Sequence, residues 1–306
     1  MGQRLAGLSR GIFSLFFISA LVHLSGCDRQ GATAEPQPTP GASTKPAHVT
    51  VASLVPAATD LILGMGAGEQ LVAVSNWDAE RAEIQKLPRV GDYRSIDWEK
   101  LGALRPQVMI VQFRADKMPA GLGERAAELG ITLVNVKNNR LADLYETLDV
   151  LGDTLQQRPK SDAAKHQIQS ELETIQKQVA AKPPVRTLLL RTAGELASVG
   201  GGNFLDELLT LAGGRNVLEG GDNSYPTLDR ERLLALDPEM ILYLLPGASQ
   251  QVIDQAKASL ASLGQLQAVK SGRVHVLTES YVLVPGYNVP NIARRFASLL
   301  HPAGGS

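Results

Sequence analysis

One stretch of this chain occurs twice. The first copy is residues 93–110, YRSIDWEKLGALRPQVMI, and the second, at an offset of 132, is residues 225–242, YPTLDRERLLALDPEMIL. Seven of the eighteen positions are identical, where roughly one identity is expected by chance at average composition. The identical pairs are Tyr93/Tyr225, Asp97/Asp229, Glu99/Glu231, Leu101/Leu233, Ala103/Ala235, Leu104/Leu236 and Pro106/Pro238. Because so long a period does not fit a solenoid, the repeat predicts two similar lobes.

The overall composition is compatible with two lobes and argues against one class of partner. The chain has 306 residues, of which 44% are hydrophobic and 20% charged, which is enough for two separate cores. Its net charge of −1 argues against a nucleic-acid partner, which usually requires a basic excess or stripe.

Apolar, β-branched segments alternate with segments of helical periodicity along most of the chain. Strands are predicted at 48–53, 71–75, 108–112, 132–136, 187–191 and 273–277. Helices are predicted at 56–70, 120–130, 203–214 and 291–301, together with a short helix in each copy of the repeat. Ser95 or Asp97 is expected to cap the first of these short helices. Strands and helices alternating at this spacing indicate an α/β fold class with parallel, doubly wound sheets.

A longer helix is predicted between the two lobes. Apolar residues recur on one face of 161–182 at spacings of 4, 4, 3 and 4, namely Ala164, Ile168, Leu172, Ile175 and Val179. Ser161 is expected to cap its start, and Pro183 and Pro184 to end it. A helix of this length spans roughly 33 Å. We therefore expect a strut joining the lobes in preference to a coiled-coil arm, which would need a longer repeat.

The beginning of the chain has the composition of an export signal. Arg4 and Arg10 precede the apolar run GIFSLFFISALV, which is shorter than the ~20 residues of a membrane span and leads to the only cysteine, Cys27. The flanking LSGC resembles the lipobox of bacterial lipoproteins, which implies cleavage before Cys27 and lipid attachment there. We expect an extracytoplasmic protein tethered to a membrane by lipid alone. The predicted domains are a signal peptide at 1–26, a lipidated cysteine and disordered tether at 27–47, a first lobe at 48–158, a linking helix at 159–184 and a second lobe at 185–306.

Motifs of several common enzyme classes are missing from the sequence. There is no G-x-S-x-G elbow, H-E-x-x-H pair or P-loop, and the five histidines are dispersed, which argues against a histidine metal cage. The GMGAG at 64–68 ends a predicted helix, so helix termination explains it better than dinucleotide binding. The GGGN at 200–203 follows a strand and precedes a helix, so it is either an anion-binding turn or simply a tight turn.

The residues at strand ends favour ligand binding instead. Ligands of open α/β sheets bind beyond the carboxyl ends of the strands, so two facing lobes would enclose a cleft with the repeated loop on each rim. Tyr93 and Tyr225 would then grip a flat or bulky ligand from opposite sides, unless each packs under its own loop. Arginines at these ends suit either an anionic ligand or a structural ion pair. The candidate ligand-binding residues are Trp77, Tyr93, Arg94, Phe113, Arg114, Arg191, Tyr225 and Tyr281.

Three stretches are similar to a known family. They resemble substrate-binding proteins of ABC importers for cobalamin and iron chelates. The stretches are residues 51–78, residues 87–112, and the pair of segments 209–217 and 225–244. The likeness runs in order through most of residues 48–302. It implies two Rossmann-like lobes bridged by one long helix, limited hinge motion, and delivery of the cargo to a permease dimer with cytoplasmic ATPases.

The resemblance also assigns roles to individual residues. Tyr93 and Tyr225 stand where cobalamin-binding members have cleft tryptophans, and this departure leaves the choice of corrinoid open. Other pocket aromatics correspond to Trp77, Tyr281 and either Phe113 or Gln112.

Glu99 and Glu231 form a second repeated pair. Both are expected in the first turn of a helix, where the helix dipole favours a carboxylate. The alternative is a matched pair of acids that meets basic residues on a partner of twofold symmetry. The resemblance favours this alternative, because the two residues match acids that dock on permease arginines.

The resulting hypothesis is a lipid-anchored, monomeric receptor that delivers a metal chelate to an ABC importer, without catalysis and without a cofactor of its own. A corrinoid is preferred to a ferric siderophore, which Arg94, Arg114 and Arg191 keep open. Haem is least favoured and would need Tyr281 or Tyr287 as a ligand. Two other classes remain, a cleft enzyme on the same architecture and a surface scaffold whose cleft is filled by side chains.

Overall fold

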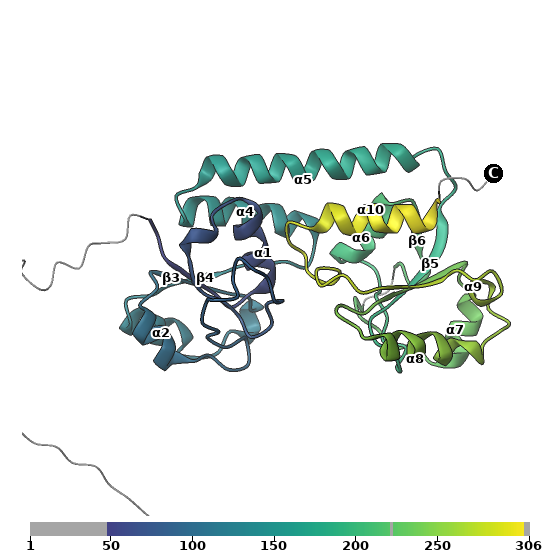
Figure 1. Ribbon diagram of the computed structural model, residues 1–306, viewed down its shortest axis with the longest axis horizontal. Coiled ribbons are helices and arrows are strands. Elements are labelled where there is room, and N and C mark those ends of the chain that lie inside the picture. Colours follow the sequence, from purple (N-terminus) through teal and green to yellow (C-terminus); the bar gives the residue numbers. More distant parts are fainter. Residues whose placement is uncertain (1–47, 221–222, 303–306) are drawn as a thin grey trace, which may run out of the picture. The chain divides into compact units, whose positions relative to one another are not determined.

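Two parallel four-stranded sheets with equivalent strand orders form the framework of the structure. The computed structural model describes residues 48–220 and 223–302, all within one compact unit that spans Pro46–Ser306. The first sheet has the order β2-β1-β3-β4 and the second the order β6-β5-β7-β8 (Figure 1). Every strand pair in both sheets is parallel, which confirms the predicted α/β fold class with two lobes.

The first lobe holds the first sheet and the helices that cover its two faces. Its elements are β1 (Val51–Ser53), α1 (Pro56–Gly64), the 3₁₀ helix η1 (Gly68–Gln70), β2 (Leu71–Ala73), α2 (Trp98–Leu104), β3 (Val108–Val111), the 3₁₀ helix η2 (Ala115–Lys117), α3 (Leu122–Glu128), β4 (Thr132–Asn135) and α4 (Leu141–Thr154). Successive residues of a strand point to opposite faces of a sheet. Accordingly, Val108 and Ile110 pack on the face shared with α1 and α4, while Met109 and Val111 pack toward α2 and α3.

The second lobe repeats this arrangement around the second sheet. Its elements are β5 (Val185–Leu190), α6 (Phe204–Leu211), β6 (Gly214–Asn216), α7 (Arg230–Leu236), β7 (Met240–Leu244), α8 (Gln250–Ala261), α9 (Gln267–Lys270), β8 (Val274–Leu277) and α10 (Val289–Leu300). The last four residues of β5 and all of β7 are buried, which explains the apolar runs at 188–190 and 240–244.

The repeated sequence forms the same unit in both lobes. Asp97 caps α2 by accepting from the backbone N–H of Lys100, and Asp229 caps α7 in the same way. Both helices have seven residues and end in a left-handed residue that precedes proline, which cannot continue a helix. Each leads into an inner strand of its sheet: Val108 of β3 pairs with Val51 of β1, and its repeat equivalent Met240 of β7 pairs with Thr187 of β5. The internal repeat is therefore a structural repeat.

A single long helix, α5 (Arg158–Val179), connects the two lobes. Its apolar stripe is buried as the spacing predicts, but the expected cap at Ser161 is wrong. The helix begins three residues earlier because Pro159 sits in its first turn, where the missing N–H costs nothing. Ser161 is buried inside the helix, and its hydroxyl donates to the carbonyl oxygen of Arg158.

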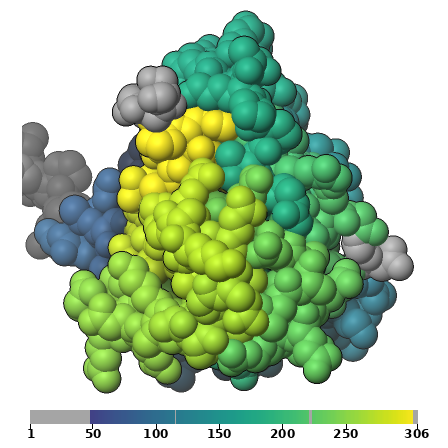
Figure 2. Space-filling view, turned by 90° about the vertical axis from the view of Figure 1, so that its right-hand side faces the viewer, coloured from purple at the N-terminus to yellow at the C-terminus, as the bar shows by residue number. Residues whose placement is uncertain are grey.

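One apolar core extends from the first lobe through α5 into the second. It joins residues of α1, α4 and α5 to residues of α6 and α10, all on the same side of the sheets in Figure 1. Figure 2 views the second lobe from its outer side and shows α10 beside α5. Each lobe has a further core of its own on the opposite face of its sheet. Separating the lobes would expose the shared core, which opposes large relative motion.

Candidate functional site

Three aromatic side chains stand out because water reaches them. Trp77 is 61% exposed, Tyr93 53% and Tyr225 39%, whereas the other aromatic residues in the described part of the chain are buried or half-buried. Exposed large apolar side chains that gather in one place mark a binding surface more often than a structural one. All three are among the residues that the sequence singled out.

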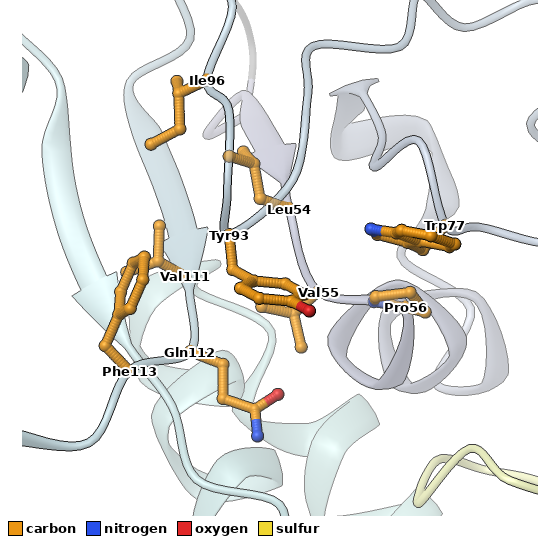
Figure 3. Close-up of a pocket in the computed structure, with 9 residues that line it drawn as sticks. All are labelled: Leu54, Val55, Pro56, Trp77, Tyr93, Ile96, Val111, Gln112 and Phe113. Atoms are coloured by element: carbon orange, nitrogen blue, oxygen red, sulfur yellow. The ribbon is translucent and has the colours of Figure 1, made fainter. Parts of the chain in front are cut away.

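Two of these residues line one cavity at the carboxyl ends of β1 and β3. The cavity has a volume of about 230 Å³ and is open to solvent on one side. Figure 3 shows Tyr93 between the ring of Phe113 and that of Trp77, with Gln112 beside it. The remaining lining residues are Leu54, Val55, Pro56, Ile96 and Val111. Sequence reasoning found the three rings, and the structure brings them together as an aromatic pocket with a single polar side chain at its edge.

The loop that carries Tyr93 is held by its own hydrogen bonds. The carboxylate of Asp92 accepts from the backbone N–H groups of Arg94 at 2.8 Å and Ser95 at 3.2 Å, and these bonds hold the pKa of Asp92 below its usual range. Gly91 has a φ of 105°, and a Cβ there would meet the carbonyl oxygen of Ser95. Only glycine suits that position, so the turn presents Tyr93 in a defined orientation.

The loop that carries Trp77 rests on a buried carboxyl group. Asp78 accepts from the backbone N–H of Ser75 at 2.8 Å and from the hydroxyl of Thr59 at 3.3 Å. Burial nevertheless raises the pKa of Asp78 to about 6, because the hydrogen bonds only partly offset the loss of hydration. Arg89 donates to the backbone carbonyls of Ser75 and Asp78, which ties both ends of this short turn.

Phe113 is positioned by a residue that sequence reasoning missed. The side chain of Asn135, at the end of β4, accepts from the backbone N–H of Phe113 at 2.8 Å and donates to its carbonyl oxygen at 2.9 Å. This two-point contact fixes the backbone from which the ring enters the pocket. An asparagine within an otherwise apolar strand, in TLVNV, was the available signal.

Two more cavities adjoin the aromatic pocket and share its wall. The first has a volume of about 210 Å³, includes Tyr93, Ile96 and Phe113, and is flanked by Arg94. The second, of about 450 Å³, includes Gln112, Phe113 and Arg114. Its other residues are mostly amides and charged side chains from the end of β4 and the segments that follow β3 and β4, namely Asp116, Asn135, Val136, Lys137, Asn138, Asn139 and Asp143. Phe113 therefore lines the aromatic pocket, a largely apolar cavity with two arginines and a polar cavity.

The predicted residues of the second lobe do not line the aromatic pocket. The guanidinium of Arg191 lies over the ring of Tyr225, with 4.6 Å from its carbon to the ring centroid. Tyr281 lines a different cavity with Glu279, Arg294 and Arg295. The cavities lined by predicted residues are thus each lined by one lobe, and Tyr93 and Tyr225 do not share any of them.

Comparisons with known proteins agree with this architecture. The family model described as periplasmic binding protein matches residues 51–281. The chain belongs to this family of periplasmic binding proteins. Two curated relatives are named Vitamin B12-binding protein. The one from Vibrio cholerae serotype O1 is 25% identical over 235 residues, covering 77% of this chain and 83% of the relative. The one from Yersinia pseudotuberculosis serotype O:3 is 28% identical over 202 residues, covering 66% and 71% respectively.

Solved structures of periplasmic binding proteins show the same fold. The periplasmic vitamin B12-binding protein of Vibrio cholerae matches with a TM-score of 0.70 and 22% identity, over 83% of this chain and 96% of that one. A periplasmic haem-binding protein of Pseudomonas aeruginosa matches with a TM-score of 0.72 and 23% identity, over 84% and 94%. Two α/β lobes joined by one helix identify this binding protein as class III among those of ABC transporters. Family membership implies an extracytoplasmic location.

The repeated acids of this binding protein lie apart from its aromatic pocket. Glu99 and Glu231 are both exposed in the first turns of α2 and α7, one in each lobe. Neither lines the aromatic pocket or the cavities beside it. The structural repeat places the two residues at equivalent positions. Because both are exposed, both carboxylates are accessible to a partner.

The turn at 200–203 is closed by the binding protein's own side chains. Asn203 caps α6 by accepting from the N–H groups of Leu205 and Asp206, and Asp206 accepts from the N–H of Gly202. Because a carboxylate already occupies the helix start, the tight-turn interpretation explains the GGGN sequence better than an anion site does.

Some sequence features of this binding protein fall outside the described residues. The predicted signal peptide, Cys27 and the tether lie in residues 1–47. Within the described parts, no helix combines the length and apolar character needed to cross a bilayer, and no cluster of three or more metal-ligating side chains occurs.

Proposed function

We propose that this protein captures a metal chelate at the aromatic pocket of its first lobe and delivers it to an ABC permease. A corrinoid is the preferred cargo. The observation that carries the proposal is the aromatic wall beyond the ends of parallel strands, in which Trp77 and Tyr93 are exposed and Phe113 is half-buried. Flat ligands stack on such rings, and a few polar groups at the edge orient them. Both curated relatives reported above are named for vitamin B12.

The pocket of the first lobe forms only part of the proposed site. Its volume of about 230 Å³ is below the range of roughly 300–1,000 Å³ typical of whole ligand sites. The ligand would therefore extend into the adjoining cavities and meet the second lobe through Tyr225, Arg191 and Tyr281. The loop at Tyr225 is the repeat equivalent of the one at Tyr93, so both lobes would present an aromatic ring beside an arginine.

A ferric siderophore is the second candidate cargo. Arg94 and Arg114 line the two cavities beside the aromatic pocket, and Arg191 lies over the ring of Tyr225 in the second lobe. Guanidinium groups pair with carboxylate or catecholate oxygens, which such chelates carry. The two cargoes depend on different residues. A neutral corrin face stacks on the rings, whereas an anionic iron chelate pairs with the arginines.

Delivery would use the repeated acids and a lipid anchor. In this proposal Glu99 and Glu231 meet basic residues on the two halves of a permease dimer, and their exposure in both lobes supports that role. Cys27 would carry the lipid that keeps the protein at the membrane. The protein would bind as a monomer and would not catalyse a reaction.

Tryptophan fluorescence tests the proposal with two reporters that occupy different cavities. The chain has two tryptophans, Trp77 in the aromatic pocket and Trp98 in the cavity beside it. Trp98→Phe leaves Trp77 as the only reporter, and Trp77→Phe leaves Trp98. Each variant is titrated with cyanocobalamin, haemin and a ferric tris-catecholate, with free N-acetyltryptophanamide as the inner-filter control.

The outcomes separate the candidates. Saturable quenching of Trp77 by cyanocobalamin alone supports the corrinoid, and saturation only by the ferric catecholate supports the second candidate. If none of the three chelates quenches either reporter beyond the inner-filter control, capture of a metal chelate at this pocket is refuted.

A further inference from the structure

Two arginines face the cavity that adjoins the aromatic pocket on the side of α2 and α3. Arg94, from the turn that carries Tyr93, lines this cavity of about 210 Å³ together with Arg125 of α3. The cavity shares Tyr93, Ile96 and Phe113 with the aromatic pocket, so a ligand lying on those rings has direct access to it. Arg125 has no role in the function proposed above.

Stacking on aromatic rings holds both guanidinium groups in place. The carbon of the Arg94 guanidinium lies 5.3 Å from the centroid of Tyr93, and its Nε donates to the Tyr93 hydroxyl at 3.0 Å. The corresponding distance from Arg125 to the Trp98 ring is 4.8 Å. A guanidinium held over a ring in this way still has further N–H groups that can donate to a ligand. The rings therefore hold two multi-donor cations beside the cavity.

This cavity carries an excess of positive charge. Neither Arg94 nor Arg125 forms a side-chain ion pair within the described residues, whereas Arg114, at the larger neighbouring cavity, pairs with Asp116 at 3.2 Å. No acidic side chain lines the cavity of Arg94 and Arg125. The Glu124 carboxylate lies close to Gly121 at its rim. Two guanidinium groups without acid partners favour an anion between them.

We propose that Arg94 and Arg125 form an anion subsite that binds an acidic group of the chelate while its flat face lies on Tyr93 and Phe113. The inference rests on the proposed function, since the subsite adjoins the proposed chelate pocket. The acidic group is a phosphodiester if the cargo is a cobalamin, or a carboxylate if it is a porphyrin chelate. The subsite then selects chelates that carry an anion beside an apolar face.

Matched pairs of ligands test the subsite. Cyanocobalamin carries a phosphodiester that dicyanocobinamide lacks, and haemin carries propionates that are capped in haemin dimethyl ester. Affinities are measured by calorimetry for the wild type, Arg94→Gln, Arg125→Gln and the double variant. In whichever pair binds, we call cyanocobalamin or haemin, which carries the acidic group, the anionic member, and the other ligand the neutral member. We expect the double variant to lose about tenfold or more in affinity for the anionic member. Its affinity for the neutral member should change by less than about twofold.

Two control variants separate the subsite from general charge effects. Arg232→Gln removes an exposed cation of α7 outside this cavity and should leave all affinities unchanged. Glu124→Gln removes the acid at the rim and should strengthen binding of the anionic member only. Thermal unfolding of each variant shows whether it remains folded.

Each contrary result has a distinct meaning. If the double variant loses equal affinity for the anionic and the neutral member, the anion role is overturned while the proposed function stays intact. The same conclusion follows if it loses affinity for neither. If the wild type binds none of these chelates, a corrinoid or haem cargo is excluded, and the proposed function then depends on the titration with the ferric catecholate. The subsite is then judged by titration with inorganic pyrophosphate, observed through the Nε–H resonances of the arginines. Shifts of the Arg94 and Arg125 signals would support an anion site, and unmoved signals would refute it.

Discussion

The side-chain amide of Asn288 donates to the buried carboxylate of Asp60, with 3.0 Å between Nδ2 and Oδ1. Asp60 lies in α1 of the first lobe and is 1% exposed, whereas Asn288 precedes α10 of the second lobe. Arg81, from the segment after Trp77, forms an ion pair with the same carboxylate. A Cβ on Gly286 would collide with Asp60, so the crossing segment lies directly against α1. One carboxylate thus ties the second lobe to the chain segment next to the ligand pocket.

Breaking this tie is expected to destabilise the fold. Asp60→Ala leaves Arg81 without its partner and should lower the free energy of unfolding by about 3–5 kcal/mol. Asn288→Ala removes only the side-chain hydrogen bonds to Asp60, keeps the one from the backbone N–H, and should lower it by about 1–3 kcal/mol. Urea unfolding measures both. Glu173→Ala, at an exposed pair with Lys177 on α5, is the control and should have no measurable effect. Equal stability of all four proteins would show that the tie contributes nothing.

Asp78 is expected to make stability depend on pH. Its pKa is about 6 in the folded protein because of burial, against 3.8 for an unperturbed aspartate, so the folded state favours the protonated form. The stability that Asp78 contributes is therefore highest below about pH 4, falls as pH rises to about 6 and is level above. At about 1.4 kcal/mol per pKa unit, the contribution amounts to about 3 kcal/mol.

Asp78→Asn isolates this contribution, since an amide oxygen can still accept from the N–H of Ser75. Unfolding free energies of both proteins are measured from pH 4 to pH 8. The wild type should lose stability relative to the variant between pH 4 and pH 6. A difference that does not vary with pH would show that Asp78 titrates normally.

The rings of the aromatic pocket should carry much of the binding energy. Tyr93→Ala and Trp77→Ala are each expected to weaken binding of the chelate by about 1–3 kcal/mol, or roughly fivefold to 150-fold. Leu129→Ala, an exposed apolar side chain outside the pocket, is the matched control. Calorimetry with whichever chelate binds the wild type gives the affinities. Losses no greater than that of the control would place the ligand elsewhere.

Asn135 should act on binding through Phe113. Asn135→Ala removes both contacts to the backbone of Phe113, so the ring loses its fixed position and the affinity should fall by roughly three- to tenfold. In a Phe113→Ala background the same change should have little further effect, because coupled residues are not additive. Full additivity of the two losses would mean that Asn135 does not work through the ring.

Reversing the repeated acids should separate capture from delivery. The double variant Glu99→Lys and Glu231→Lys is expected to bind the chelate normally, since neither residue lines the pocket or its adjoining cavities, and to abolish uptake in cells. Glu128→Lys with Asp254→Lys, again one exposed acid per lobe, should leave uptake intact. A collapse of chelate affinity in the first pair would refute the docking role.

Local sequence patterns predicted a large part of this architecture. The repeat anticipated two equivalent capped helices, because an aspartate cap, a buried leucine and a terminating proline act within a few residues of one another. Most strands were recognisable as short runs rich in apolar and β-branched residues, because strands that are buried on both faces favour such residues. The exposed rings of Trp77 and Tyr93 were found because ligand sites in such sheets follow the strand ends.

Only the tertiary structure decided which of these parts meet. Asp60 and Asn288 are 228 residues apart, and Phe113 and Asn135 are 22 apart, so no local periodicity records either contact. The same reason left the stacking of Arg125 on Trp98 unforeseen and the grouping of Tyr225 with Arg191 undecided. The sequence by itself determined the elements and their capping through short-range physics. The packing of the lobes on one shared core determined which side chains form the pocket, since that depends on contacts between distant segments.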